Sequence, residues 1–566
     1  MGVSILHVMS SETSARTARQ RLQLPQVLWA LTLIVAVWMT LQAFDAARRF
    51  SDRPFDFDEA VHALPAYQIA LDLRALDIEA FWAHSLEQDR LASYPFLHSW
   101  LLAPALVFTG ADPAAARLAN TAFVWLSLGL VAWATRPLAP AGAKGVAPPL
   151  AALFLALSLP IWTYANTVLL EGSGLVVTLA WLGAYLRARP GAWPGWLWLT
   201  GLLAAAAFFT KYSFGIFILG GMLLSEVLTM LVERRPMTRR WLALFGPPTM
   251  LIGLWLILPD KLDRLAGYSV SQHASLAFWS WENWLYAPIN ALRFYAPGPL
   301  TAGLMAATLA LAPMRWREAG PRQAAAAVLA GLAALTWVPQ KDARFLYTVA
   351  PLLIPPAAAL AAHALQVLGS RQTLRWWIAA ATLVELGSGL TRLTRYAETL
   401  QTVYNTSPDT RSLYQFVLDG SLAAGWRPRL LNAWYQVNAL AVSWAYYERF
   451  GGTPAGDAYQ LATQSQIDVA DETSRAALFA DLRAAGIGVL YTIDGSPAGT
   501  VTGWAVVEPA LAAGDLTSLA PPVAQSPPYT LYVWPREVQE RLLAGEISSA
   551  GKPVTFVVRL NAYQVQ

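Results

Sequence analysis

Three carboxylates stand close together just after the first long apolar run of the chain. Asp56, Asp58 and Glu59 lie in the stretch PFDFDEAVHALPAYQIALDL, which runs from Pro54 to Leu73. One carboxylate could take a proton from an acceptor hydroxyl, while its neighbours orient that hydroxyl or hold a divalent cation through oxygen ligands. A solvated loop that leads into a helix, with Asp58 as N-cap and Glu59 in the first turn, explains one of these acids better than all of them.

A further acid, Glu171, lies in TYANTVLLEGSGLVVTLAW, at the turn between two apolar runs. It could be an ordinary interfacial residue that starts the following helix, where the helix dipole favours a negative charge. An acid at full depth in an apolar hairpin is unfavourable by about 2.5–3.5 kcal/mol, so a functional role is the alternative. Both interpretations stay open at this point.

Isolated cations mark two other turns between apolar runs. Lys341, Asp342 and Arg344 come together in VPQKDARFLYTVAPLL, either as an internal ion pair of Asp342 with Arg344 or as a clamp for phosphate, whose oxygens match the arginine fork. Lys211, in FFTKYSFG, could equally extend its ammonium harmlessly to the interface. His62 and His98 are the histidines nearest the acids, and we interpret both as packed or hydrogen-bonded residues rather than metal ligands.

The composition indicates the class of protein in which these charges lie. Of 566 residues, 56% are hydrophobic and only 13% are charged, so the chain is predicted to be a polytopic α-helical membrane protein. The absence of cysteine excludes thiol catalysis, disulfides and thiolate metal sites. A net charge of +4 is small for this length and does not indicate nucleic-acid binding.

About eleven apolar runs are long enough, or nearly so, to cross a bilayer. They cover residues 26–44, 116–135, 147–165, 171–187, 195–209, 212–232, 241–258, 298–313, 323–339, 346–367 and 376–392. With residues 1–25 in the cytoplasm, five basic connections fall on the cytoplasmic side, as the positive-inside rule requires. These connections are Arg136–Lys144, Arg187–Arg189, Arg234–Arg240, Arg315–Arg322 and Arg371–Arg375.

One shorter run, Phe96–Thr109, would move every later basic connection to the outer side if it crossed the membrane. Pro104 interrupts it, so we expect a re-entrant or juxtamembrane helix that is buried against protein. The first external loop, residues 45–95, then carries the acids on the outer face, in a helix near the membrane surface with Ala60, Leu64 and Tyr67 on its apolar side. The transmembrane domain is expected to cover residues 26–393.

Residues 394–566 contain no spanning run and are predicted to form an extracytoplasmic, soluble α/β domain. A helix is expected between the first and second of four strands, at Thr473–Ala485. The expected strands are Arg429–Ala433, Gly488–Ile493, Thr530–Trp534 and Val554–Leu560.

Taken together, these motifs resemble the GT-C class of membrane glycosyltransferases, in particular the polyprenyl-phosphate-sugar transferases related to protein O-mannosyltransferases and the lipid A aminoarabinose transferase. The resemblance covers about residues 20–395. Asp58 and Glu59 stand at the Asp-Glu positions of the first-loop motif, Glu171 at the second acid, and Lys211 at a Thr-Lys turn. QKDARF is similar to a His-Lys-Glu-Glu-Arg-Phe motif, with Gln340 in place of the histidine. A Glu-Lys-Pro-Pro form of the aminoarabinose transferases is replaced by residues 92–95, so that sugar is not expected.

The resemblance implies an inverting hexosyl- or pentosyltransferase that moves a sugar from a polyprenyl-phosphate carrier to a lipid, glycan or protein acceptor at the outer membrane face. Asp58 is then the candidate base, and Glu59 and Glu171 help to hold the acceptor or a divalent metal cation. Asp58 and Glu171 are the candidate metal ligands. The candidate substrate-binding residues are Tyr94, Lys211, Lys341 and Arg344, with the cations neutralising the leaving phosphate.

Two other classes compete with this interpretation. A secondary transporter of a small polar substrate also combines many spans with acids, but transporter sites usually lie near the midplane on broken helices in repeated halves. Here the acids cluster in outward loops and no internal repeat stands out. A noncatalytic scaffold that keeps the fold is the second rival, and the retained acids argue against it.

Overall fold

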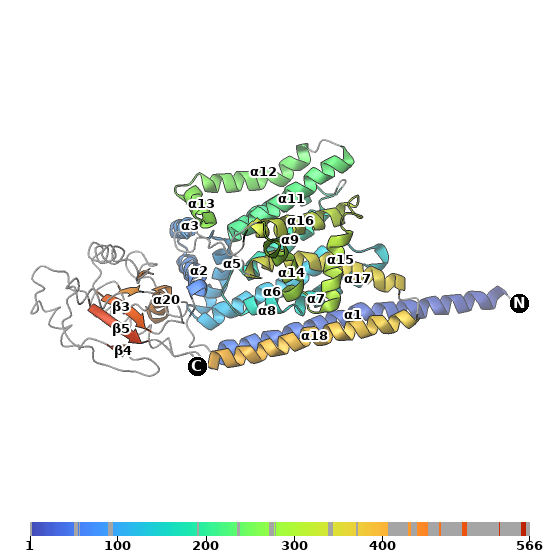
Figure 1. The fold of residues 1–566 in the computed structure, drawn as a ribbon, viewed down its shortest axis with the longest axis horizontal. Helices are drawn as coiled ribbons and strands as arrows, with labels where there is room; N and C mark the ends of the chain where they lie inside the picture. The colour runs from blue at the N-terminus through green and yellow to red at the C-terminus, as the bar shows by residue number, and fades with distance from the viewer. Residues whose placement is uncertain are drawn as a thin grey trace, which may run out of the picture. The chain divides into compact units, whose positions relative to one another are not determined.

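The computed structural model describes residues 3–49, 55, 57–88, 94–189, 192–234, 238–270, 277, 279–337, 343–368, 372–405, 428–431, 439–450, 463–465, 489–494, 531–532 and 556–561. The chain forms two compact units (Figure 1). The first contains residues 1–48, 85–102 and 117–402, and the second contains residues 49–84, 103–116 and 403–566.

Helices account for most of the described residues. In chain order they are α1 (Val3–Arg49), α2 (Phe57–Ala75), α3 (Ile78–Glu87), α5 (Leu97–Thr109), α6 (Pro113–Thr135), η1 (Ala141–Ala143), α7 (Ala147–Ala156), α8 (Leu159–Ala165), α9 (Glu171–Arg187), α10 (Gly195–Thr210), α11 (Tyr212–Glu233), α12 (Thr238–Leu256), α13 (Lys261–Val270), α14 (Trp281–Asn290), η2 (Ala291–Tyr295), α15 (Pro299–Leu311), α16 (Ala319–Trp337), η3 (Ala343–Thr348), η4 (Ala350–Leu353), α17 (Ile354–Leu368), α18 (Gln372–Asn405) and α20 (Ala439–Phe450).

The apolar runs expected to span a membrane all fall on these helices. Among the residues that the structure describes, four stretches are long and apolar enough to cross a membrane by themselves, namely 24–48, 113–135, 212–233 and 344–367. The run 147–165 is a pair of helices, α7 and α8, bent by 60° where Pro160 starts the second helix. The remaining runs lie on shorter or more polar helices, so the full count of about eleven spans stays a prediction.

Small residues bring three helices of the first unit into close contact. A methyl group at Gly221 of α11 would lie 2.7 Å from the Cα of Ala327 in α16, which is closer than atoms can approach. A methyl group at Gly215 would lie 2.3 Å from the Cβ of Phe208 in α10. Glycine at these two positions therefore permits the packing of α10, α11 and α16, as small residues do in membrane helices.

The second unit contains α2, α3, α20 and a five-stranded sheet. The strands are β1 (Pro428–Leu431), β2 (Thr463–Ser465), β3 (Val489–Asp494), β4 (Leu531–Tyr532) and β5 (Phe556–Asn561). Their order is β2-β1-β3-β5-β4, parallel throughout except that β4 runs antiparallel to β5. Figure 1 labels β3, β5 and β4 next to one another.

The strands β1, β3, β4 and β5 overlap the four ranges expected from the sequence. In the register of the central pair, Val489 faces Phe556 and Asp494 faces Asn561. β2 was not anticipated, because Thr463–Ser465 is short and carries no run of β-branched residues. The expected helix Thr473–Ala485 lies outside the described residues.

Helix α2 begins at Phe57 and carries Asp58 and Glu59 in its first turn, as expected. Its environment differs from the expectation of a surface helix with one buried side. Residues 59–70 are all buried, including His62 and Gln68. The helix is therefore enclosed by protein on every side over these turns, and its polar side chains must find partners within the fold.

Candidate functional site

A buried ion pair joins two charges that the sequence places forty residues apart. The Lys211 Nζ lies 3.5 Å from the Glu171 Oε1, and each side chain is only 3% exposed. Glu171 is the first residue of α9, where the helix dipole stabilises a negative charge. Lys211 occupies an extended break between α10 and α11, with φ −156° and ψ 130°. The break turns the lysine away from the helical path and toward α9.

Aromatic rings surround the lysine. Its Nζ lies 5.3 Å from the ring centroid of Tyr94, 5.3 Å from that of Phe214 and 5.1 Å from that of Phe345. Ring faces attract a cation within about 6 Å, and more strongly where water is absent. Glu171 and the rings together thus stabilise a positive charge inside the first unit.

The start of α9 is also tied to α5 and α6. The His98 ring Nδ1 of α5 lies 2.8 Å from the Ser173 Oγ of α9. The Asn120 Nδ2 of α6 donates to three carbonyl oxygens in the segment before α9, those of Tyr164 at 3.2 Å, Thr167 at 2.5 Å and Leu169 at 3.0 Å. These bonds hold the chain just before α9 in place and so orient Glu171.

Burial lowers the pKa of His98 to about 4, because a charged ring would lose its hydration, and a hydrogen bond with the Val168 backbone opposes this shift. His98 lies on α5, outside the candidate spans. The ring is therefore neutral near pH 7 and acts as a hydrogen-bonding residue. The expectation that it is packed and hydrogen-bonded is confirmed.

The expected site residues are distributed over both units. Glu171, Lys211 and Tyr94 come together in the first unit. Arg344 is half-buried and precedes Phe345, whose ring contacts the lysine. Asp58, half-buried, and Glu59, buried, belong to the second unit, so their convergence with Glu171 stays a prediction.

Some of the expected residues cannot be placed. Asp56, Lys341 and Asp342 lie outside the described residues, so both the phosphate clamp and the alternative Asp342–Arg344 pair stay predictions. Among the residues that the structure describes, no group of three His, Asp or Glu side chains gathers as a metal-binding set. Glu171 is instead in contact with Lys211.

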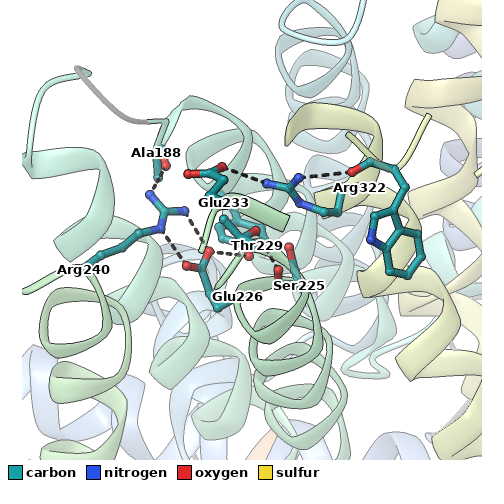
Figure 2. A network of polar contacts seen from close by, with 9 residues as sticks. Ala188, Ser225, Glu226, Thr229, Glu233, Arg240 and Arg322 are labelled. Carbon is teal, nitrogen blue, oxygen red and sulfur yellow. Dashed lines mark hydrogen bonds and ion pairs between the residues drawn. The ribbon is translucent and has the colours of Figure 1, made fainter. Parts of the chain in front are cut away.

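A second buried charge cluster of the first unit was not anticipated from the sequence (Figure 2). Glu226 of α11 accepts two hydrogen bonds from the Arg240 guanidinium of α12, at 2.6 and 2.7 Å, and one from the Tyr185 hydroxyl of α9, at 2.8 Å. From α16, Arg322 reaches Glu233 at 3.3 Å (Figure 2). The sequence feature that could have indicated this cluster is Glu226 itself, an acid within a run of apolar residues.

This cluster and the Glu171–Lys211 pair use opposite ends of α9. Arg240 also donates to the carbonyl oxygen of Ala188, the C-cap residue just after α9 (Figure 2). Fork-shaped arginine contacts of this kind fix the relative position of helices. We assign the Glu226 cluster to holding α9, α11 and α12 together.

The fold and this site define a helical membrane protein with a buried charged centre among apolar helices. No family model matches the chain, and no curated protein matches it. Solved structures do match. ArnT from Cupriavidus metallidurans bound to undecaprenyl phosphate aligns with a TM-score of 0.48 and 15% identity, over 80% of this chain and 90% of that one.

The apo state of the same ArnT aligns with a TM-score of 0.46 and 15% identity, over 76% of this chain and 86% of that one. The oligosaccharyltransferase of Archaeoglobus fulgidus in complex with Zn and sulfate aligns with a TM-score of 0.47 and 12% identity, over 91% of this chain and 80% of that one. The solved structures that align with the chain are of the class that its sequence motifs resemble.

Proposed function

We propose that the protein is a membrane glycosyltransferase that moves a sugar from a polyprenyl-phosphate carrier to an acceptor hydroxyl at the outer face of the membrane. The single observation that supports this most is the buried Glu171–Lys211 pair with its aromatic surround. A polyprenyl phosphate has an apolar tail and an anionic head. An enzyme that binds it therefore needs a positively charged side chain held inside the protein at the end of apolar helices. Lys211 meets that requirement.

In the proposed reaction, Asp58 accepts the proton of the acceptor hydroxyl. The acceptor oxygen forms a bond with the anomeric carbon while the bond from that carbon to the phosphate oxygen breaks. The electron pair of the broken bond leaves with the polyprenyl phosphate, and the anomeric configuration is inverted. Lys211 and Arg344 stabilise the negative charge that develops on the phosphate, and Glu59 and Glu171 orient the acceptor and the lysine.

A divalent cation bound by Asp58 and Glu171 would supply further stabilisation of the leaving phosphate. The described side chains do not make a complete ligand set, because the Glu171 carboxylate contacts Lys211 and no third acid or histidine joins it among them. The proposed reaction is therefore carried out by the side chains of this chain.

The test is a transfer assay with the full-length protein purified in lipid. A panel of labelled polyprenyl-phosphate sugars is incubated with candidate acceptors, with and without divalent metal, and the product is identified. We expect one donor class to be consumed and Asp58→Asn to lose transfer by about 10²- to 10⁴-fold, the usual contribution of a general base.

Asp263→Asn is the matched control, because Asp263 is an exposed acid in the first turn of another short helix, α13. We expect it to transfer sugar at the rate of the unchanged protein. Full transfer by Asp58→Asn would remove Asp58 from the mechanism, and no turnover of any polyprenyl-phosphate sugar would overturn the proposed function.

A further inference from the structure

The helix that carries the two candidate acids packs against a helix from the far end of the chain. Residues 49–84 and 403–566 belong to the same compact unit. Trp444 of α20 is 1% exposed, and its ring centroid lies 4.5 Å from that of Phe55 and 5.6 Å from that of Tyr67. Phe55 stands only three residues before Asp58, so this aromatic contact lies beside the first turn of α2.

A chain of polar contacts continues from the same face of α20 through α2. The Tyr447 hydroxyl donates to the Gln68 Oε1 at 3.5 Å, and the Gln68 Nε2 donates to the Asp72 Oδ1 at 3.3 Å. The other oxygen of Asp72 lies 2.8 Å from the His84 Nδ1, at the end of α3. Gln68, Asp72 and Tyr447 are buried, so each contact satisfies a polar group that water cannot reach.

The last turn of α2 is also held. The Arg74 guanidinium donates to the carbonyl oxygens of Val107 at 2.7 Å and Leu106 at 3.1 Å, at the end of α5. The Leu106 carbonyl also accepts from the Gly110 N–H at 2.9 Å, so Arg74 adds a second hydrogen bond there and binds the Val107 carbonyl in the last turn of α5. α2 is therefore fixed near its start, at its middle and at its end.

We propose that Trp444 and Tyr447 are positioning residues for Asp58 and Glu59. The proposal rests on the proposed function, because it assumes that these acids act on the acceptor. Neither aromatic residue touches reacting atoms in this mechanism. They hold α2 through Phe55, Tyr67 and Gln68, and so the C-terminal part of the chain sets the position of the candidate base.

The first measurement is the steady-state rate of the full-length protein with the labelled donor. We expect Trp444→Ala to lower kcat by about 10- to 100-fold, the effect of a misplacement of about 1 Å, with a much smaller change in the donor KM. Trp444→Phe, which keeps a ring between Phe55 and Tyr67, restores most of that loss. Tyr447→Phe also lowers kcat, by a smaller factor than Trp444→Ala.

Tyr446→Phe is the matched control for Tyr447→Phe. It loses the same hydroxyl from the neighbouring position of α20, but the Tyr446 ring packs on Phe450, at 4.6 Å between centroids. We expect it to leave kcat and KM unchanged. Tyr447→Phe removes a single oxygen atom, so it keeps the test decisive if Trp444→Ala does not fold.

The second measurement follows α2 directly. Because the chain contains no cysteine, Leu76→Cys, at an 82% exposed position just after α2, gives one site for a spin label. We expect Trp444→Ala and Tyr447→Phe to increase the label's mobility, and Tyr446→Phe to leave it as it was.

The outcomes separate this proposal from the proposed function. Unchanged kcat and unchanged label mobility in both Trp444→Ala and Tyr447→Phe would overturn the positioning role while Asp58→Asn still abolished transfer. Increased mobility with no loss of kcat would overturn it too. Full transfer by Asp58→Asn would instead overturn the assignment of the base, whatever the α20 variants do.

Discussion

The Glu171–Lys211 pair places two opposite charges where water does not reach them. Such a pair gains little stability over apolar residues of similar size, because both charges lose their hydration. Removal of one partner is different, since it leaves the other charge buried without compensation and is unfavourable by about 3–5 kcal/mol. This difference separates a structural role of the pair from a role in transfer.

We expect Glu171→Gln to lower thermal stability strongly, because it leaves the Lys211 ammonium without its carboxylate. Adding Lys211→Met should restore most of that stability, because the rings of Tyr94 and Phe345 can pack on the apolar side chain. Transfer should not return in the double variant if Lys211 binds the phosphate. The measurements are the melting temperature in lipid or detergent and the rate of transfer.

Glu318→Gln serves as the control in that experiment. Glu318 and Arg315 form an ion pair, 2.6 Å apart, with side chains that are 54% and 42% exposed. Exposed pairs contribute about 0–1 kcal/mol, so little change is expected. A double variant of Glu171 and Lys211 that transfers sugar normally would show that the pair is structural.

Isolated charges in apolar runs were the residue-level signal that the sequence offered, and this signal was informative at Glu171 and Lys211. Their convergence could not be derived, because it depends on how α9 packs against the α10–α11 break. Phe345 was missed for a related reason. A lone aromatic residue in an aromatic-rich chain is not distinctive until the cation beside it is known.

At the scale of elements, the α10–α11 break places Lys211, and Gly215 permits the tight packing that follows. We expect Gly215→Ala to destabilise the protein by about 1–3 kcal/mol, because the added methyl group meets Phe208 and must displace the turn. The transfer rate should fall together with stability, because the substitution displaces Lys211. Thermal unfolding and the transfer rate are the measurements.

Gly220→Ala is the matched substitution in the same helix, because nothing lies within 4 Å of the added methyl group. Alanine favours a helix over glycine by about 1 kcal/mol, so this variant should be as stable as the unchanged protein or slightly more so. If both variants behaved alike, the close contact of Gly215 with Phe208 would not be what positions Lys211.

Elements were predictable where local patterns are strong. Runs of Val, Leu, Ile and Tyr between turn residues located β3 and β5, and apolar length located the helices of the first unit. The environment of α2 was not predictable. Its buried polar residues, Gln68 and Asp72, have partners on α20 and α3, and no periodicity in one helix can indicate a partner hundreds of residues away.

At the scale of the whole molecule, the arrangement across the membrane can be tested with single cysteines. Leu76→Cys, in the loop that the sequence predicts to be external, should react with an impermeant maleimide from outside intact cells. Lys144→Cys, at an exposed basic connection, should react only in inverted vesicles. Residues 96–109 and 116–135 lie between these two positions. Reaction of both from one side would mean that residues 96–109 cross the membrane after all.

The order of the strands has a consequence for biosynthesis. β5, residues 556–561, comes late in the chain but lies between β3 and β4 in the interior of the sheet. The ribosome makes it after every helix of the first unit, so a nascent chain can insert its apolar segments long before this sheet is complete. If α20 sets the place of Asp58, as inferred above, and the C-terminal domain lies outside, as the sequence predicts, we expect the newly inserted protein to stay inactive until β5 has been translocated.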